Sequence, residues 1–308
     1  MSEDQPLTPQ EVADSLRIAK NTVYELVKRG ELAAYKVGNK FRFNAKDVEA
    51  YKSGGGSREV PVGTGSGESK SPAFILAGQD MLLDILAQRL EAHPKGTRVF
   101  RSYLGSYNGL HALYQGTVHA ATAHLWDGRT DTYNLPYLPY MVPGTPLVVL
   151  HLALRTVGFY VSQGNPKGLA SWADLGRPDL TLVNRERGSG MRVLLDERLR
   201  LRGLRTREVP GYRRACTTHL AAAATVSRGG GDYALGSEKA ARQVNGIDFI
   251  PLQQERYELV FQKEDEAEPR FQALVEIVQS RGFRQELDAL GGYGTRETGR
   301  FMDLDTAP

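Results

Sequence analysis

The sequence of 308 residues contains a single cysteine, Cys216. One cysteine cannot form an internal disulfide or a cysteine-rich zinc module, and it is consistent with a reducing compartment. Because free cysteines behave as small apolar residues, we expect Cys216 to be buried.

Long apolar segments are absent as well. The most apolar stretch, residues 146–161, is interrupted by His151 and Arg155, so it is too short and too polar to cross a membrane as a helix. Residues 1–6 are acidic and polar and lack the basic and apolar regions of a secretory signal peptide. We therefore expect a cytoplasmic protein with no membrane partner.

The motifs of several enzyme classes are also missing. The sequence contains no G-x-x-x-x-G-K-[ST] phosphate loop, no G-x-S-x-G nucleophile elbow and no H-E-x-x-H zinc motif. For His124 and His219, packing or hydrogen bonding is the expected role rather than metal ligation. We therefore expect no enzyme activity, no metal site and no cofactor.

A glycine- and serine-rich segment, residues 53–71, divides the sequence (SGGGSREVPVGTGSGESKS). Such a composition is typical of a flexible linker. Since the chain length also favours two domains, at about 100–200 residues each, we expect a small domain over residues 1–52 and a larger one over residues 72–308.

The first segment has the pattern of two short helices, a hairpin and a third helix. Thr8-Pro9-Gln10-Glu11 is a capping box at a helix start. A second helix is expected over residues 20–29, ending at Gly30. Residues 32–43 have the pattern of a two-stranded hairpin around Gly38-Asn39, and residues 45–52 that of the last helix. This order is that of a winged helix-turn-helix.

The string LTPQEVADSLRIAKNTVYELVKRGELAAYKVGNKFRFNAKDVEAY covers nearly the whole segment and resembles the excisionase-like, MerR-related DNA-binding family. Its charge supports DNA binding independently. Between Arg17 and Arg42 there are seven basic and two acidic residues, a net charge of +5, and phosphate neutralisation requires such a concentration.

In this fold the N-terminal part of the second helix faces base edges in the major groove. The wing would then hold the adjacent DNA backbone. The candidate DNA contacts on the second helix and the wing are Lys20, Asn21, Thr22, Tyr24, Lys28, Arg29, Lys36, Lys40 and Arg42. The same fold also serves excisionases, which bend DNA.

The second segment alternates strands with helices, which predicts an α/β fold with a mainly parallel sheet. Strands are expected over residues 74–77, 97–103 and 118–123, and helices over residues 81–91 and 110–115. Polar glycine or serine loops precede helices at residues 78–80, 105–107, 184–192 and 236–238. Helix N-termini bind anions, so four such loops favour a shared ligand site.

Eight strings within residues 73–300 carry a resemblance to the two-lobed type II periplasmic-binding-protein-like domain: AGQD, SYLGSYNGL, AHLWD, YNLPY, GNP, VNRERGSGMRVLLD, THLAAAATV and DFIPLQQERYELV. The segment is most similar to the molybdate/tungstate-binding type found behind helix-turn-helix heads. The resemblance implies lobe I over about 73–153 and 257–303, lobe II over about 154–256, and a ligand in the cleft that holds the lobes closed.

Oxyanion receptors of this type bind their ligand with hydroxyls and backbone amides, which points to Ser106 in lobe I and Ser189 in lobe II. Asp80 departs from that pattern, because a carboxylate facing the cleft would repel an oxyanion. We expect it to cap its helix; otherwise the ligand is neutral or cationic. Arg187 and Arg192 either raise the positive potential of the cleft or lie paired or solvated outside it. The candidate ligand-binding residues are Gln79, Asp80, Ser106, Tyr107, His124, Arg187, Gly188, Ser189, His219 and Ser237.

The sequence as a whole predicts a transcriptional regulator that binds double-stranded DNA and responds to a small oxyanion effector, with molybdate or tungstate favoured. A homodimer is expected because helix-turn-helix proteins commonly bind two-fold symmetric sites. The alternatives are an excisionase-like DNA-bending factor and a regulator of a different small metabolite. A transport receptor and an enzyme built on the two-lobed fold are the remaining hypotheses.

Overall fold

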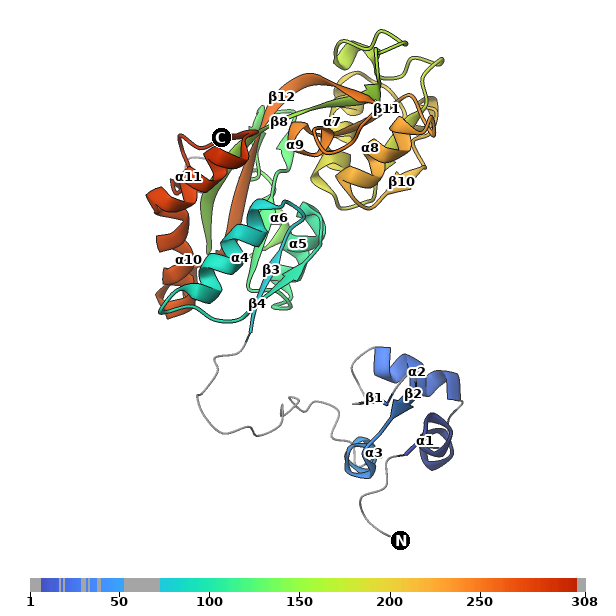
Figure 1. Ribbon diagram of the computed structural model, residues 1–308, viewed down its shortest axis with the longest axis vertical. Coiled ribbons are helices and arrows are strands. Elements are labelled where there is room, and N and C mark those ends of the chain that lie inside the picture. The colour runs from blue at the N-terminus through green and yellow to red at the C-terminus, as the bar shows by residue number, and fades with distance from the viewer. Residues whose placement is uncertain are drawn as a thin grey trace. The chain divides into compact units, whose positions relative to one another are not determined.

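The computed structural model describes residues 7–16, 18, 20–28, 32, 34–37, 40–52 and 73–303. The chain divides into two compact units, Met1–Ser69 and Lys70–Pro308 (Figure 1). The expected linker at residues 53–71, the helix end at Gly30 and the turn at Gly38-Asn39 lie outside the described residues.

Among the described residues of the first unit there are three helices and one hairpin, in the order that the sequence predicts. Their bounds are α1 Pro9–Leu16, α2 Lys20–Lys28, β1 Tyr35–Val37, β2 Lys40–Arg42 and α3 Ala45–Lys52. The two strands are antiparallel, with Tyr35 opposite Arg42. At the start of α1 the backbone amide of Thr8 donates to Glu11 Oε2 at 2.7 Å, and the amide of Glu11 donates to Thr8 Oγ1 at 3.3 Å. This reciprocal pair confirms the predicted capping box.

A small apolar core holds these elements together, and it is formed by residues of the three helices, by Leu32 between α2 and β1, and by Phe43 directly after the wing. The buried members are Val12, Ala13, Val23, Leu26, Leu32, Phe43 and Val48. The positions in α1 and α2 follow the helical spacing of apolar residues.

The second unit begins with alternating strands and helices: β3 Phe74–Ala77, α4 Leu82–Ala92, β4 Val99–Ser102, α5 Ser106–Tyr114 and β5 Ala120–Ala123. A second alternating set follows a long strand: β9 Leu182–Arg185, α7 Gly190–Leu201, β10 Ala215–Cys216, α8 His219–Ser227, β11 Tyr233–Ser237 and α9 Glu238–Ala241. The two long strands are β8 Leu147–Ser162 and β12 Ile247–Gln262, and the chain returns through α10 Pro269–Gln279, α11 Arg281–Leu290, β13 Tyr293–Gly294 and β14 Phe301–Met302. The shorter elements are β6 Trp126–Asp127, β7 Thr132–Tyr133 and α6 Leu138–Met141.

The sheet of this unit is mixed rather than mainly parallel, which corrects the expectation from the sequence. Its strand order is β10-β9-β11-β8-β12-β5-β3-β4. The pairs β3/β4, β3/β5, β9/β10 and β9/β11 are parallel, whereas β8 pairs antiparallel with β11 and with β12. Parallel order therefore holds on either side of the two long strands, and the long strands themselves run in opposite directions.

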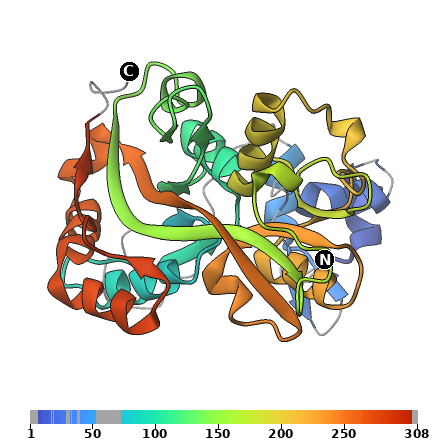
Figure 2. The same ribbon diagram turned by 90° about the horizontal axis from the view of Figure 1, so that it is seen from above.

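Figure 2 shows β8 and β12 running side by side across the second unit, with one group of strands and helices on each side. Each side has its own apolar clusters, which include Phe74, Leu83 and Phe271 on the side of β3, and Phe159, Leu195 and Tyr233 on the side of β9. The fold is thus the expected two-lobed α/β fold. The lobe boundaries expected from the sequence fall inside the long strands, where Ala153 pairs with Tyr257.

Two further expectations concern Cys216 and the membrane. Cys216 lies at the end of β10 and is only partly buried, which corrects the expectation of a buried thiol. In the described part of the chain, no helix has the length and apolar character that crossing a membrane requires.

Candidate functional site

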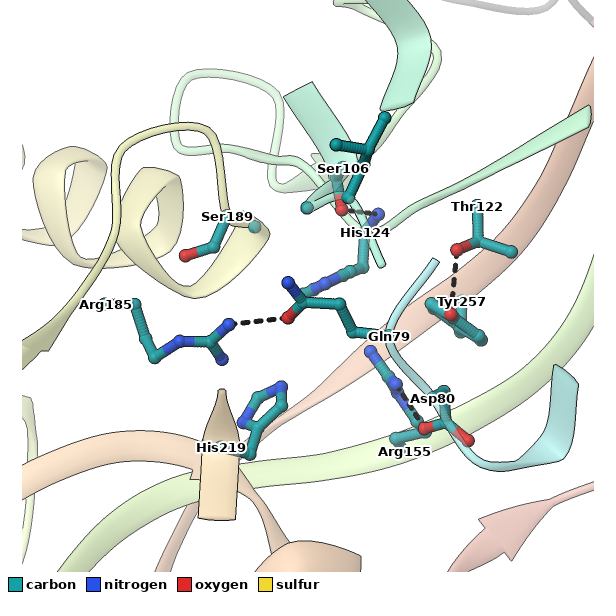
Figure 3. Close-up of a pocket in the computed structure, with 13 residues that line it drawn as sticks. Gln79, Asp80, Ser106, Thr122, His124, Arg155, Arg185, Ser189, His219 and Tyr257 are labelled. Atoms are coloured by element: carbon teal, nitrogen blue, oxygen red, sulfur yellow. Dashed lines mark hydrogen bonds and ion pairs between the residues drawn. The ribbon is translucent and has the colours of Figure 1, made fainter. Parts of the chain in front are cut away.

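A cleft lies between the two lobes, at the carboxyl ends of parallel strands from both of them. Loops after β3, β4 and β5 form one wall, and loops after β9 and β10 form the other. In open α/β sheets ligands bind outside these carboxyl ends. The lining residues are Gln79, Asp80, Leu104, Gly105, Ser106, Thr122, His124, Arg155, Arg185, Ser189, Gly190, His219 and Tyr257 (Figure 3).

The two walls are in direct contact, so the cleft is closed. The backbone amide of Tyr107 in lobe I donates to the carbonyl of Gly188 in lobe II at 2.9 Å. A Cβ on Gly105 would lie 2.7 Å from the Gly188 oxygen, and one on Gly190 would lie 2.5 Å from the ring of His124. Glycine is needed at both positions for this approach. The free volume that remains is about 10 Å³, room for about one water molecule.

Gln79 lies in the middle of this space, and its side chain spans the cleft (Figure 3). Its Oε1 accepts a hydrogen bond from Arg185 Nη2 at 2.6 Å. Its Nε2 donates to the carbonyl oxygens of Tyr103 at 3.1 Å and Thr217 at 3.4 Å, and to Glu186 Oε1 at 3.3 Å. An amide from lobe I therefore occupies the centre of the cleft and is held by lobe II.

Arg185 is the cation that points into the centre of the cleft. It is the last residue of β9, and only 2% of its surface is exposed. Its Nε pairs with Glu186 Oε2 at 2.9 Å, and its Nη2 donates to Glu186 Oε1 at 3.0 Å and to the Thr217 carbonyl at 3.2 Å. The position of the guanidinium is thus fixed by its own loop, which leaves Gln79 as its one contact from lobe I among the hydrogen bonds of the described residues.

A second arginine, Arg155, is neutralised in the middle of the two long strands β8 and β12, which connect the lobes and which we call the hinge. Arg155 and Glu255 lie opposite each other in β8 and β12, with Nη2 2.5 Å from Glu255 Oε1. Its Nη1 lies 2.5 Å from Asp80 Oδ2, and the guanidinium stacks on Tyr257 at 3.8 Å. Burial disfavours both charges, but Glu255 and Asp80 raise the pKa of Arg155, and Arg155 and His124 lower the pKa of Glu255. Arg155 and Glu255 are therefore both charged, and Arg155, held between two carboxylates, has no charge to spare for a ligand.

Asp80 does not present a free charge to the cleft. Its Oδ1 accepts hydrogen bonds from the backbone amide of Leu82, at the start of α4, at 2.8 Å and from the Tyr293 hydroxyl at 2.6 Å. With Oδ2 paired to Arg155, every part of the carboxylate is engaged. Asp80 thus accepts from the first amide of α4, as the expected role at this helix start requires, although Met81 is the residue in the N-cap position.

Ser106 and Ser189 line the cleft from opposite lobes at the N-termini of two helices. Ser106 is the first residue of α5, and its Oγ accepts from the backbone amide of His124 at 3.2 Å. Ser189 caps α7, and its Oγ accepts from the backbone amide of Arg192 at 3.2 Å. Each hydroxyl keeps its own hydrogen for donation, and both helix N-termini carry partial positive charge.

The two histidines of the cleft differ in their surroundings. His124 Nδ1 lies 2.8 Å from Glu255 Oε2. His219 Nδ1 is inaccessible to solvent and has no hydrogen-bond partner among the described residues. Burial, and then the charges of Arg185 and Arg155, lower the pKa of His219 well below its ordinary value, so this ring is neutral near pH 7. Within the described ranges, no group of three His, Cys, Asp or Glu residues could hold a metal ion.

The structure brings six of the ten candidate ligand residues into the cleft: Gln79, Asp80, Ser106, His124, Ser189 and His219. The other four lie elsewhere. Tyr107 is half exposed, Gly188 contributes its carbonyl to the contact between lobes, and Ser237 lines an adjoining outer cavity. Arg187 lines a separate hollow on lobe II together with Arg192, because the chain turns at Gly188, whose φ is +90°.

Sequence reasoning missed the two arginines and two other polar residues of the cleft, which are Thr122, Arg155, Arg185 and Tyr257. One signal was present for Arg155, since it interrupts the most apolar stretch of the chain. Arg192, by contrast, is buried and structural: its Nη1 donates to the Arg185 carbonyl at 3.0 Å, and its Nε lies 3.3 Å from Asp196.

In the first unit, the described candidates for DNA contact lie on α2 and β2. Lys20 and Thr22 are exposed in the first turn of α2. Tyr24 is 38% exposed and packs 6.1 Å from the ring of Phe41 on the wing. Arg42 is partly buried and donates to the Phe41 carbonyl at 3.0 Å. The structure describes the backbone but not the side chain of four further candidates, which are Asn21, Lys28, Lys36 and Lys40. Arg29 lies outside the described residues.

Comparison with protein families assigns both parts of the chain. Residues 87–279 match the PBP superfamily domain, and residues 6–55 match a helix-turn-helix domain. The chain belongs to the PBP superfamily domain family. A relative of this PBP-domain protein in Bacillus subtilis (strain 168), "Uncharacterized protein YvgK", is 39% identical over 309 residues, which cover 98% of the chain and 99% of the relative.

Solved structures share the fold of the PBP domain at low sequence identity. An ABC-type phosphate transport receptor from Vibrio cholerae is 16% identical with a TM-score of 0.50, over 72% of this chain and 99% of the receptor. The sulfate-binding protein SubI from Mycobacterium tuberculosis H37Rv is 14% identical with a TM-score of 0.52, over 73% of this chain and 86% of SubI. These likenesses show the two-lobed fold of the PBP domain. The fusion of a helix-turn-helix domain of excisionase type with this domain agrees with the resemblance seen in the sequence.

Proposed function

We propose that this protein is a DNA-binding transcriptional regulator that responds to a small oxyanion bound in the cleft of its PBP domain. A helix-turn-helix domain and a ligand-binding domain in one chain support a ligand-responsive regulator. A DNA-bending accessory factor needs no ligand cleft, so the second unit favours regulation over an excisionase-like role.

One observation carries the oxyanion proposal: the Arg185 guanidinium and the N-termini of α5 and α7 line the same small cleft from two lobes. Arg185 now donates to a neutral amide oxygen at 2.6 Å. An oxyanion oxygen in that position would gain a charge-assisted hydrogen bond, and the Ser106 and Ser189 hydroxyls could donate to its other oxygens. Because little free volume remains, the ligand must displace the Gln79 side chain.

Molybdate and tungstate are the first candidates, on the resemblance of residues 73–300 to receptors of that type. Phosphate and sulfate are the next, since two of the similar structures are named for those anions. Ligand binding would hold the two lobes closed, and closure would change the affinity for DNA through a difference in ligand affinity between the open and closed states. We propose a homodimer as the unit in which this occurs.

Calorimetric titration of the full chain with molybdate, tungstate, phosphate and sulfate tests the proposal. Ser106→Ala and Ser189→Ala should each lower the affinity for the binding anion about tenfold, since a hydrogen bond to a charged group contributes about 1.5 kcal/mol or more. Ser280→Ala is the matched control, because Ser280 caps α11 in the same way but lies outside the cleft. Absence of binding heat for all four anions would contradict the oxyanion assignment.

A second experiment measures whether the anion changes the affinity for DNA. DNA fragments selected from genomic DNA by the full chain should be bound with an affinity that changes when the binding anion is added. The same shift should be reduced in Ser106→Ala at equal anion concentration. If anion binds but DNA affinity does not change, the protein is a receptor without regulatory coupling.

A further inference from the structure

A second, larger cavity adjoins the cleft on its outer side, and we call it the outer cavity. Its volume is about 390 Å³, within the range of about 300–1,000 Å³ typical of small-molecule sites. It shares Gln79, Asp80 and His219 with the inner cleft. Its other lining residues are Met81, Tyr103, Thr217, Thr218, Leu220, Ser237, Lys239, Ala240 and Gln243.

The wall of the outer cavity is mainly apolar and comes from both lobes. Met81 precedes α4 and Tyr103 follows β4 in lobe I, while Leu220 lies in the first turn of α8 in lobe II. These three side chains are 39%, 66% and 44% exposed. Large apolar side chains that are exposed to solvent and lie around one cavity are typical of a binding site for an apolar group.

Both charged residues of the outer cavity are engaged by neighbouring groups of the protein. Of its two charged residues, Asp80 is paired with Arg155. The Lys239 ammonium donates to the Leu290 carbonyl and lies 5.9 Å from the centre of the Tyr293 ring. Because the accessible lining is mainly apolar, a ligand group in this cavity is expected to be apolar, in contrast to the oxyanion group that is proposed to bind at Arg185 in the inner cleft.

From this juxtaposition we propose that the effector is an organic anion: an oxyanion group lies in the inner cleft, and an uncharged apolar body lies in the outer cavity against Met81, Tyr103 and Leu220. The proposal rests on the oxyanion function proposed above and specifies its ligand class. An inorganic oxyanion would fill the inner cleft alone. A phosphonate, sulfonate or phosphate ester with a short alkyl or aryl body would fill both parts, since the two cavities share Gln79, Asp80 and His219 in their walls.

A homologous ligand series tests the proposal with the full chain. Calorimetry would compare inorganic phosphate and sulfate with methyl-, propyl-, pentyl- and phenyl-phosphonate and with the matching sulfonates. Each buried methylene contributes about 0.8 kcal/mol, so affinity should rise about fourfold for each added methylene until the cavity is filled.

Two leucine variants locate the effect. Leu220→Ser places a hydroxyl in the wall of the outer cavity and should flatten the dependence of affinity on chain length, with the affinity for methylphosphonate nearly unchanged. Leu201→Ser is the matched control, because Leu201 is 48% exposed on α7 and does not line either cavity. It should leave the full dependence on chain length intact.

The outcomes separate this proposal from the one on which it rests. If an inorganic oxyanion such as molybdate or phosphate binds and longer bodies do not increase affinity, the organic-anion proposal is overturned and the oxyanion proposal stands. A gain with chain length that survives in Leu220→Ser also overturns it, because the body then lies elsewhere. If neither the inorganic anions nor the series binds, the oxyanion proposal itself has failed.

Discussion

Replacement of Gln79 by alanine removes the one side chain that fills the centre of the closed cleft. In the structure its Oε1 accepts from Arg185 Nη2 at 2.6 Å, and its Nε2 makes three longer hydrogen bonds of 3.1–3.4 Å. If an anion must displace this amide, these bonds stabilise the ligand-free state and must break on binding. Gln79→Ala should therefore increase the affinity for the anion.

The size of the increase follows from the bond that the ligand no longer has to break. A hydrogen bond to a charged group contributes about 1.5–3 kcal/mol. Gln79 is only partly buried, so water can replace part of the interaction, and we take the lower end. About 1.5 kcal/mol corresponds to a roughly tenfold lower Kd.

Gln79→Glu should act in the opposite direction. One carboxylate oxygen would pair with Arg185, whereas the other would face the three oxygens that now accept from Nε2. The negative charge that this variant adds to the cleft would repel the anion and lower its affinity. Calorimetry with molybdate and phosphate on both variants measures whether each substitution raises or lowers the affinity for the anion. Gln262→Ala is the control, because the Gln262 side chain donates to the Leu113 carbonyl at 3.3 Å and lies far along β12 from the cleft. A lower affinity in Gln79→Ala would refute the reasoning, because it would mean that Gln79 binds the ligand instead of holding its place.

Three further predictions concern DNA, assembly and pH. Replacing Lys40 and Arg42 by alanine should weaken DNA binding and lower the slope of log affinity against log salt by about 0.9 for each phosphate that is no longer neutralised; an unchanged slope would exclude the wing as a phosphate clamp. Light scattering should give the mass of a dimer for the full chain, and a monomer both free and on DNA would contradict the assembly proposed here. Because the pKa of His219 is lowered in the folded chain, this histidine takes up a proton in the unfolded chain at a higher pH than in the folded chain. The contribution of neutral His219 to the free energy of unfolding is therefore fully present above about pH 6.5 and is lost as the pH falls below that value. His219→Gln should therefore reduce the decrease of Tm between about pH 6.5 and 5, although not abolish it, since burial and Arg270 also lower the pKa of His119. An identical pH dependence in the variant would remove His219 from this account.

The helices and the hairpin of the first unit could be predicted because local patterns specify them. Thr8 and Glu11 are three residues apart, and they cap the helix that begins between them. Val23 and Leu26 are three residues apart on α2, and both lie in the core. Such signals lie within one turn of the chain and do not depend on its distant parts.

The mixed sheet could not be predicted in this way, because its decisive pairing is non-local. β8 and β12 pair from Leu147↔Gln262 to Ser162↔Ile247, with a whole lobe between them in sequence. Strand pairing at that distance has no local sequence signal, and strands that alternate with helices in each lobe favour a parallel sheet. The same pairing brings Arg155 opposite Glu255, so their ion pair was hidden for the same reason.

For the cleft, the sequence identified the right loops more reliably than the right side chains. Gln79, Ser106 and Ser189 were found because each lies between a strand and a helix start. In the loop after β9, however, Arg187 was chosen and Arg185 was missed. Alternation of side chains holds only as far as the strand does; β9 ends at Arg185, and the turn at Gly188 directs Arg187 to another surface.

The arrangement of the hinge indicates which contacts differ between the open and closed lobes. Removing one partner of a buried ion pair costs about 3–5 kcal/mol, so a rotation that separated Arg155 from Asp80 and Glu255 would be expensive. A rotation about the middle of β8 and β12 can leave these pairs intact, since Arg155 and Glu255 lie there themselves. The contacts that must then break are those across the cleft, from Gln79 to Arg185 and from Tyr107 to Gly188. Because Gln79 and Asp80 are adjacent in the chain, a ligand that displaces the amide acts one residue away from the carboxylate that anchors lobe I to the hinge.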